Sequence, residues 1–215
     1  GEGGYLVPPP GYMELLKKAC EKHGALFIAD EVQAGAGRSG KMWSIEHSNI
    51  LPHMITWGKG MGGDLPMAGV TFRADLATKL VEASQPGTFA GNALSATVCM
   101  TNIDILTDKD DDLMGRVAQL GGEMKTRLQE GAASTRIIGD VRGRGLFIGV
   151  ELVKDKETRE PADGAMIGNI LSELLNRGVI AVPCGRYGTV VRFMPVLNHT
   201  ESLSGKGHRY PAECL

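Results

Sequence analysis

Asp30 and Lys59 are the residues whose positions first indicate chemistry. Asp30 ends the apolar run 25–29, and Lys59 follows the short run 54–57 and stands between two glycines. A carboxylate at the end of a buried strand is costly unless a cation pairs with it. A lysine that is desolvated near a cation has a lowered pKa, which makes its amine available as a nucleophile. Alone, an aspartate is typical of a turn and a lysine of a solvated surface, so this prediction depends on both residues together.

Pyridoxal 5'-phosphate (PLP) is a cofactor whose needs these two residues match. It requires a lysine that forms a Schiff base and a carboxylate that keeps the pyridine nitrogen protonated. It also requires donors for its phosphate and a group that binds the substrate carboxylate. Lys59 fits the first role and Asp30 the second, and the glycines beside Lys59 would let the backbone approach a flat ring.

The segments around these residues indicate an α/β layer. Apolar residues at helical spacing predict a helix over 12–23, ended by Gly24. Short apolar runs predict strands at 25–30, 54–57 and 68–73. Helix, strand, loop and strand in this order are typical of a layer that presents active-site groups at the carboxyl ends of its strands.

The second half does not alternate strictly between strands and helices, which indicates a separate, smaller α+β domain. The expected helices are 93–106, 113–129 and 163–177. The expected strands are an antiparallel pair within 137–153, then 179–182 and 189–193. The domains are therefore predicted as residues 1–105 and 106–215, with an irregular tail from about 198 because that part has no apolar periodicity.

Composition narrows the classes of function. The chain is 42% hydrophobic and 22% charged with a net charge of −2, which is ordinary for a soluble globular protein. The chain has no basic block that would indicate nucleic-acid binding, and it has no apolar run long enough to span a membrane. The cysteines form no CxxC pair, so neither a metal site nor a disulfide framework is indicated, and a reducing cytoplasm is expected. The four cysteines are Cys20, Cys99, Cys184 and Cys214.

The segment GAGRSGK (35–41) satisfies two nucleotide-binding patterns, GxGxxG and GxxxxGK. A phosphate loop would need a Ser or Thr after Lys41 to bind Mg²⁺, and Met42 stands there. No helical periodicity begins at Lys41 either. We therefore interpret the segment as a glycine-rich turn and expect no dependence of Mg-ATP binding on Lys41.

Longer motifs resemble the class III aminotransferases of PLP fold type I. The resemblance begins with GEGGYLVPPPGY and continues through LFIADEVQAGAGRSG, ITWGKGMGGDLPMAGV, GTFAGN, DVRGRGLFIGVELV and VVRFMP. These motifs stand in family order over about residues 1–197. The resemblance implies part of a fold type I large domain, a mostly parallel sheet with helices, followed by a smaller α+β C-terminal domain.

The resemblance also implies roles for individual residues. Lys59 would form the Schiff base with PLP and then carry a proton, and Asp30 would pair with the pyridine nitrogen. Val32 would pack on the ring face, and Gln33 would approach its phenolic oxygen. Two further roles are implied outside this group. Thr88 would reach the phosphate of a partner subunit across a homodimer, and Arg192 would bind the substrate carboxylate.

The resemblance has departures that bear on function. The family's N-terminal part, which supplies the phosphate loop and an aromatic that stacks on PLP, has no counterpart here, so a fragment is expected. Val196 stands where the family usually has a second proline after Arg-x-x-Pro, and the tail after Leu197 does not resemble the family's terminal helix. Arg142 and Arg144 are expected to brace the second domain.

Three functions stay open at this point. The first is transfer of an amino group between an amino acid or amine and a 2-oxo acid. The second is decarboxylation of the dialkylglycine type or racemisation with the same cofactor, because PLP permits these reactions and pocket geometry chooses among them. The third is a catalytically incomplete fragment that keeps part of the fold and of the dimer surface.

Overall fold

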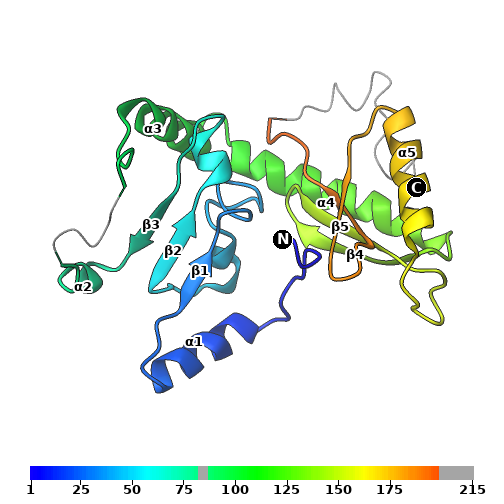
Figure 1. The fold of residues 1–215 in the computed structure, drawn as a ribbon, viewed down its shortest axis with the longest axis horizontal. Coiled ribbons are helices and arrows are strands. Elements are labelled where there is room, and N and C mark those ends of the chain that lie inside the picture. The colour runs from blue at the N-terminus through cyan, green and yellow to red at the C-terminus, as the bar shows by residue number, and fades with distance from the viewer. Residues whose placement is uncertain (82–86, 199–215) are drawn as a thin grey trace. The chain divides into compact units, whose positions relative to one another are not determined.

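The structure is a computed structural model that describes residues 1–81 and 87–198 (Figure 1). The irregular tail expected from about residue 198 therefore lies almost wholly outside the described residues. Within the described residues, no helix is both long and apolar enough to cross a membrane.

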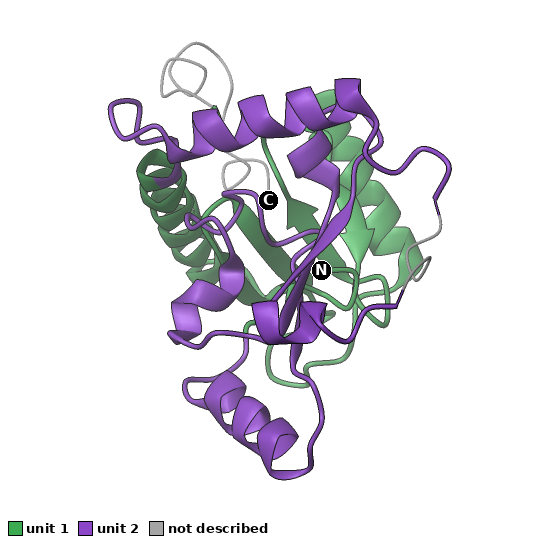
Figure 2. Ribbon diagram, turned by 90° about the vertical axis from the view of Figure 1, so that its left-hand side faces the viewer, with its two compact units in different colours: residues 1–7, 115–215 green, residues 8–114 purple. Residues whose placement is uncertain are grey.

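Contacts divide the chain into two compact units (Figure 2). One consists of residues 8–114, and the other combines residues 1–7 with residues 115–215. Residues 1–7, here called the opening segment, thus pack with the second half of the chain. In the sequence they are separated from it by the 107 residues from 8 to 114. The domain boundary that the sequence suggests near Leu106 stays a prediction.

The unit of residues 8–114 holds a mixed three-stranded sheet in the order β1-β2-β3. Strands β1 and β2 are parallel, whereas β2 and β3 are antiparallel. Its elements are α1 (Tyr12–Lys22), β1 (Ile28–Asp30), η1 (Ser44–Ser48), β2 (Met54–Trp57), η2 (Lys59–Gly62), β3 (Gly69–Phe72), α2 (Ala74–Ala77) and α3 (Ala93–Thr107). The helices and strands predicted here are observed, except that the strand predicted over 25–30 begins only at Ile28. Among the described residues only one strand pair of this sheet is parallel.

Helix α1 ends as its sequence predicts. Gly24 follows the C-cap residue His23 and has a φ of 66°, in the left-handed region that glycine adopts at low cost. The amides of Gly24 and Ala25 donate to the carbonyls of Glu21 and Cys20. These two bonds satisfy carbonyls that the helix leaves open, which is the Schellman arrangement.

The other unit holds a four-stranded antiparallel sheet in the order β4-β5-β7-β6. Its elements are α4 (Leu113–Ala133), which begins two residues before the division, β4 (Ile138–Arg144), β5 (Phe147–Leu152), α5 (Gly164–Asn176), β6 (Val182–Cys184) and β7 (Val190–Phe193). The glycine-rich pair of strands is antiparallel, as predicted.

Two apolar surfaces form the core of this unit. Helix α4 buries a stripe at helical spacing, which is the pattern of an amphipathic helix packed on a core. The stripe consists of Val117, Leu120, Met124 and Leu128. Strand β5 buries the alternating side chains of Ile148, Val150 and Leu152. Because alternate residues of a strand face opposite sides, the other face of β5 carries Phe147, Gly149 and Glu151.

The strand predicted over 179–182 is wrong for most of its length, because β6 begins at Val182. Gly178 has a φ of 80°, and the amide of Val179 donates to the carbonyl of Leu174. This bond belongs to the C-terminal cap of α5, so Val179 completes the helix end rather than starting a strand.

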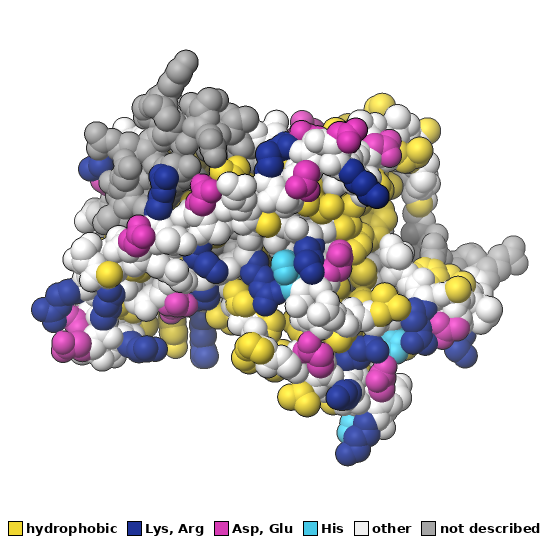
Figure 3. All heavy atoms as spheres, turned by 180° about the vertical axis from the view of Figure 1, so that it is seen from behind, with side chains coloured by type: hydrophobic (Ala, Val, Ile, Leu, Met, Phe, Trp, Pro, Cys, Tyr) yellow, Lys and Arg dark blue, Asp and Glu magenta, His cyan; other side chains and the backbone are white. Residues whose placement is uncertain are grey.

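Apolar side chains remain exposed on the unit of residues 8–114. Leu15 of α1 is 68% exposed, Ile28 of β1 51% and Val70 of β3 50%. Figure 3 shows one face of the molecule, on which hydrophobic side chains lie among charged ones. Scattered exposed apolar residues are common on protein surfaces, so by themselves they do not identify a partner.

Candidate active site

The candidate cofactor residues come from the carboxyl ends of two neighbouring parallel strands. In the β1–β2 register, Asp30 lies opposite Thr56. Lys59 follows Thr56 by three residues, at the start of η2. Because the two strands run in the same direction, both residues emerge at one edge of the sheet.

Asp30 is held by its immediate neighbours. Its Oδ1 accepts hydrogen bonds from the amide of Val32 at 3.1 Å and from the hydroxyl of Thr56 at 3.2 Å. Among the described residues, both hydrogen bonds to this carboxylate are accepted by Oδ1. The second oxygen, Oδ2, can therefore accept from a further donor. Asp30 itself is exposed, so the burial that the sequence suggested for it is not observed.

Lys59 has a constrained backbone. Its φ is 48°, in the left-handed region that a residue with a Cβ rarely adopts. Such a conformation persists only where the surroundings hold it, and it is frequent at functional sites. The side chain is exposed, in contrast to the burial expected from sequence.

Asn102 of α3 supports the segment that follows Lys59. Its side-chain amide donates to the carbonyls of Gly60 at 3.4 Å and Met61 at 3.1 Å. Sequence reasoning missed this residue. The available signal was an amide in a helix that is otherwise largely apolar, since a polar side chain there needs a partner.

Glu31 organises the turn that carries Val32 and Gln33. It is 5% exposed, and its two oxygens accept the amides of Ser44 at 3.0 Å and Ile45 at 2.7 Å. Burial raises the pKa of Glu31 above its ordinary value, although the two amide bonds act in the opposite direction. The carboxylate thereby joins β1 to η1 across the intervening residues.

The segment 35–41 forms turns, as its glycine-rich sequence predicts. The amide of Arg38 bonds to the carbonyl of Gly35, and that of Gly40 bonds to the carbonyl of Gly37. The next regular element is the short 3-10 helix η1, which begins at Ser44. Thr88 lies exposed in the turn that precedes α3.

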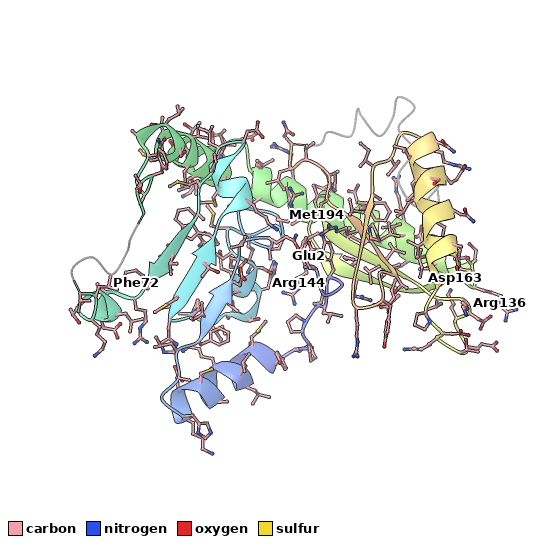
Figure 4. The ribbon with its side chains drawn as sticks, in the orientation of Figure 1. Glu2, Phe72, Arg136, Arg144, Asp163 and Met194 are labelled. Carbon is pink, nitrogen blue, oxygen red and sulfur yellow. The ribbon has the colours of Figure 1, made fainter. Side chains whose placement is uncertain are left out.

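Arg192 belongs to the other unit, in β7. Its guanidinium pairs with Glu2, a residue of the opening segment (labelled in Figure 4). The side chain of Arg192 is 20% exposed and that of Glu2 is 69% exposed. The candidate carboxylate-binding residue therefore already holds a carboxylate of its own chain.

Arg142 fixes the opening segment on the same sheet. Its Nε and Nη2 donate to the carbonyl of Gly4 at 2.9 and 2.6 Å, and its Nη1 bonds to Asp140 at 2.8 Å and to Glu151. Burial acts to lower the pKa of Arg142, but these two carboxylates leave that pKa raised above its ordinary value. The bracing role expected of Arg142 is confirmed.

Tyr5 lies between the two arginines. Arg142 of β4, Gly149 of β5 and Arg192 of β7 stand opposite one another in the register and so point to the same face of the sheet. A Cβ at Gly149 would lie only 3.1 Å from Cβ of Tyr5 and 3.0 Å from Cγ1 of Val190. The missing side chain of Gly149 thus makes room for Tyr5.

The predicted residues therefore fall into two groups. Asp30, Val32, Gln33, Lys59 and Thr88 belong to the unit of residues 8–114, where the β1–β2 register brings Asp30 and Lys59 to one sheet edge. Arg192 belongs to the unit that contains the opening segment, and sequence reasoning gave no sign of its partner there.

Comparisons with known proteins fit this arrangement. Residues 1–208 match the family described as Aminotransferase class-III. The chain is 33% identical over 215 residues to a 5-aminovalerate aminotransferase of Pseudomonas aeruginosa, covering 100% of this chain and 50% of that protein. It is 40% identical over 162 residues to a leucine/methionine racemase of Thermococcus litoralis, covering 75% of this chain and 36% of that protein.

A solved structure shares the fold over the full chain. Taurine:2-oxoglutarate aminotransferase from Bifidobacterium kashiwanohense, in complex with PLP and glutamate, superposes with a TM-score of 0.89 at 29% identity. The match covers 100% of this chain and 49% of that one. The chain belongs to the class III aminotransferase family, which is PLP-dependent, and it spans about half the length of these aminotransferases.

The residues described here fit PLP in two respects. Asp30 offers a carboxylate oxygen at the sheet edge where a pyridine nitrogen would need one, and Thr56 and Val32 fix its orientation. Lys59 offers an exposed amine from a held backbone at the same edge. When bound, PLP supplies an electron-accepting ring that stabilises negative charge on a substrate carbon.

Proposed function

We propose that this chain carries the cofactor lysine and the substrate arginine of an enzyme that moves an amino group between an amino acid or amine and a 2-oxo acid. The observation that supports this proposal best is the placement of Asp30 and Lys59 at the ends of adjacent parallel strands. This placement is consistent with the interpretation of the chain as part of a fold type I enzyme. In that interpretation residues 8–114 would be part of a large domain whose sheet is mostly parallel.

Asp30 and Lys59 have complementary tasks in this proposal. Asp30 would offer Oδ2 to the pyridine nitrogen and keep it protonated, while Val32 and Thr56 hold Oδ1 and so fix the carboxylate plane. Lys59 would hold the cofactor through its amine, and with substrate bound the same amine would carry a proton to or from the substrate α-carbon. Gln33 serves the phenolic oxygen of the ring.

Arg192 binds a carboxylate of the substrate through its planar guanidinium, which matches a carboxylate in a two-point arrangement. Thr88 contributes to the phosphate site of a second subunit, so the active enzyme is a homodimer. The aminovalerate and taurine enzymes act on substrates with an amino group and an acidic group, and a guanidinium suits the acidic group.

Cofactor binding tests the proposal without measuring turnover. Added PLP should give the near-visible absorbance band of PLP bound to a lysine amine. Reduction with borohydride should then leave a mass increase on the peptide that contains Lys59. Lys59→Ala should abolish both signals, because Lys59 is the amine that follows β2 at the edge where β1 ends in Asp30.

Lys41→Ala is the matched control. Lys41 also lies in a glycine-rich segment, but its amine bonds to the carbonyl of Glu46 at 3.3 Å. This variant should keep the band and the modified peptide. If the wild-type chain gives no band, or if Lys59→Ala keeps it, the proposed role of Lys59 is wrong for this chain.

A second candidate function is racemisation with the same cofactor, or decarboxylation of a dialkyl amino acid. The relative that favours racemisation is the leucine/methionine racemase. Chiral analysis of leucine and detection of CO₂ distinguish the reactions. Loss of optical activity without an oxo-acid product would favour racemisation, whereas CO₂ release from a dialkyl amino acid would favour decarboxylation.

A catalytically incomplete fragment is the remaining alternative. It predicts a chain that folds but forms no band with PLP, because the chain spans only about half the length of the aminotransferases it matches. The same PLP titration therefore separates this alternative from the enzyme.

A further inference from the structure

The hydroxyl of Tyr5 is an unusual group in this sheet. Tyr5 is 2% exposed, and its ring stacks on Phe147 with the centroids 3.9 Å apart. The oxygen is buried, and among the described residues it makes no hydrogen bond of ordinary geometry. A buried polar group without a well-formed hydrogen bond costs free energy, so a tyrosine here rather than a phenylalanine calls for a reason.

Arg192 stands next to this hydroxyl. Tyr5 covers Gly149, whose partner in the register is Arg192 on β7. Burial raises the pKa of Tyr5 to about 12, and the positive charge of the nearby Arg192 guanidinium opposes this shift. The hydroxyl therefore keeps its proton over the working pH range and can donate it.

The two arginines of this face differ in their availability. Arg142 is occupied by the carbonyl of Gly4 and by the carboxylates of Asp140 and Glu151. Arg192 pairs with Glu2, whose side chain is 69% exposed, and ion pairs with so exposed a partner are in general weak. A ligand carboxylate can therefore replace that of Glu2 on Arg192.

A carboxylate needs more than one guanidinium when it is removed from water. Its two oxygens offer about four acceptor positions, and a two-point guanidinium bond uses two of them. Each remaining position that is buried without a donor weakens binding. Arg192 alone does not supply these donors, whereas the Tyr5 hydroxyl beside it has a proton to give.

We propose that Tyr5 is a specificity-determining residue whose hydroxyl donates a hydrogen bond to the carboxylate bound by Arg192. The ligand class is a carboxylic acid that replaces Glu2, with its carboxylate between the guanidinium and the phenol. This inference rests on the proposed role of Arg192. It adds a donor that makes binding of a carboxylate more favourable than binding of a neutral amide.

The experiment compares glutarate with glutaramide, its uncharged analogue, by calorimetric titration of the 215-residue chain. Tyr5→Phe keeps the ring that stacks on Phe147 and removes only the hydroxyl. We expect it to weaken glutarate binding about tenfold, as loss of one hydrogen bond to a charged group does. Tyr12→Phe, at a 48% exposed position of α1, is the matched control and should bind as the wild type does.

The variant Arg192→Lys tests the role of Tyr5 separately from the proposed role of Arg192. If Arg192→Lys weakens binding and Tyr5→Phe does not, the role of Tyr5 is refuted while that of Arg192 stands. If the wild type does not bind glutarate, or Arg192→Lys binds it equally well, both are refuted. A second readout needs no variant: glutarate, but not glutaramide, should shift the near-ultraviolet absorbance of tyrosine in the wild-type chain.

Discussion

Substitution of Arg142 by lysine should destabilise the unit that contains it by about 1–3 kcal/mol. The arginine makes two bonds to the carbonyl of Gly4 and one to each of two carboxylates, those of Asp140 and Glu151. A lysine ammonium is a single point on a flexible stem and cannot meet all of these acceptors at once. About two hydrogen bonds would be lost, at about 0.5–1.5 kcal/mol each.

Arg144→Lys is the matched control, because Arg144 lies on the same strand but is exposed (labelled in Figure 4). Substitution at such a position changes stability by about 0.5 kcal/mol or less. Urea unfolding followed by far-ultraviolet circular dichroism would compare the two variants. Hydrogen exchange of the peptide over residues 1–7 gives a local readout, which should rise in Arg142→Lys alone.

Two results would refute this reasoning. One is equal stability of Arg142→Lys and Arg144→Lys, which would mean that the several hydrogen bonds of the Arg142 guanidinium do not stabilise this unit. The other is unchanged exchange over residues 1–7 in Arg142→Lys, which would mean that the bonds to Gly4 do not hold the opening segment.

Two further predictions concern other positions. Because burial raises the pKa of Glu31 above its ordinary 4.5, the folded state keeps this proton to a higher pH than the unfolded state does, and stability should fall as pH rises through the raised pKa. Glu31→Gln should remove that part of the pH dependence, seen in melting temperatures across a pH series. Gly121→Ala should destabilise the protein, because its Cβ would overlap the backbone of Gly145. The neighbouring Gly122→Ala meets open space and should stabilise helix α4 by up to about 1 kcal/mol, as urea unfolding of both would show.

Local signals in the sequence predicted most elements of the fold but mistook one helix end for a strand. Gly24 and Gly178 both follow a helix and both have a positive φ. After Gly24 the strand predicted over 25–30 is observed as β1 only from Ile28, because the amide of Ala25 still bonds back to Cys20. After Gly178 the β-branched run that starts at Val179 suggested a strand, because pattern alone does not show that the amide of Val179 bonds back to Leu174.

The candidate site was predictable where its residues follow strands and not where they depend on distant partners. Asp30 and Lys59 carry a local signal, the end of an apolar run, and the family motifs marked Arg192. The partners Glu2 and Tyr5 lie far from Arg192 in the sequence, and no periodicity or spacing connects them. The exposure of Asp30 and Lys59 was also missed, since a short apolar run does not show what covers the strand end.

The placement of residues 1–7 on the second half of the chain has a consequence for folding. The bonds from Arg142 to Gly4 and from Arg192 to Glu2 join residues 138 and 190 positions apart. Loop-closure entropy grows only by about 0.6 kcal/mol for each doubling of length, so such contacts cost little more at equilibrium than shorter ones. They do form slowly, because contact order governs the rate. The proposed carboxylate site around Arg192 should therefore be among the last parts of this chain to assemble.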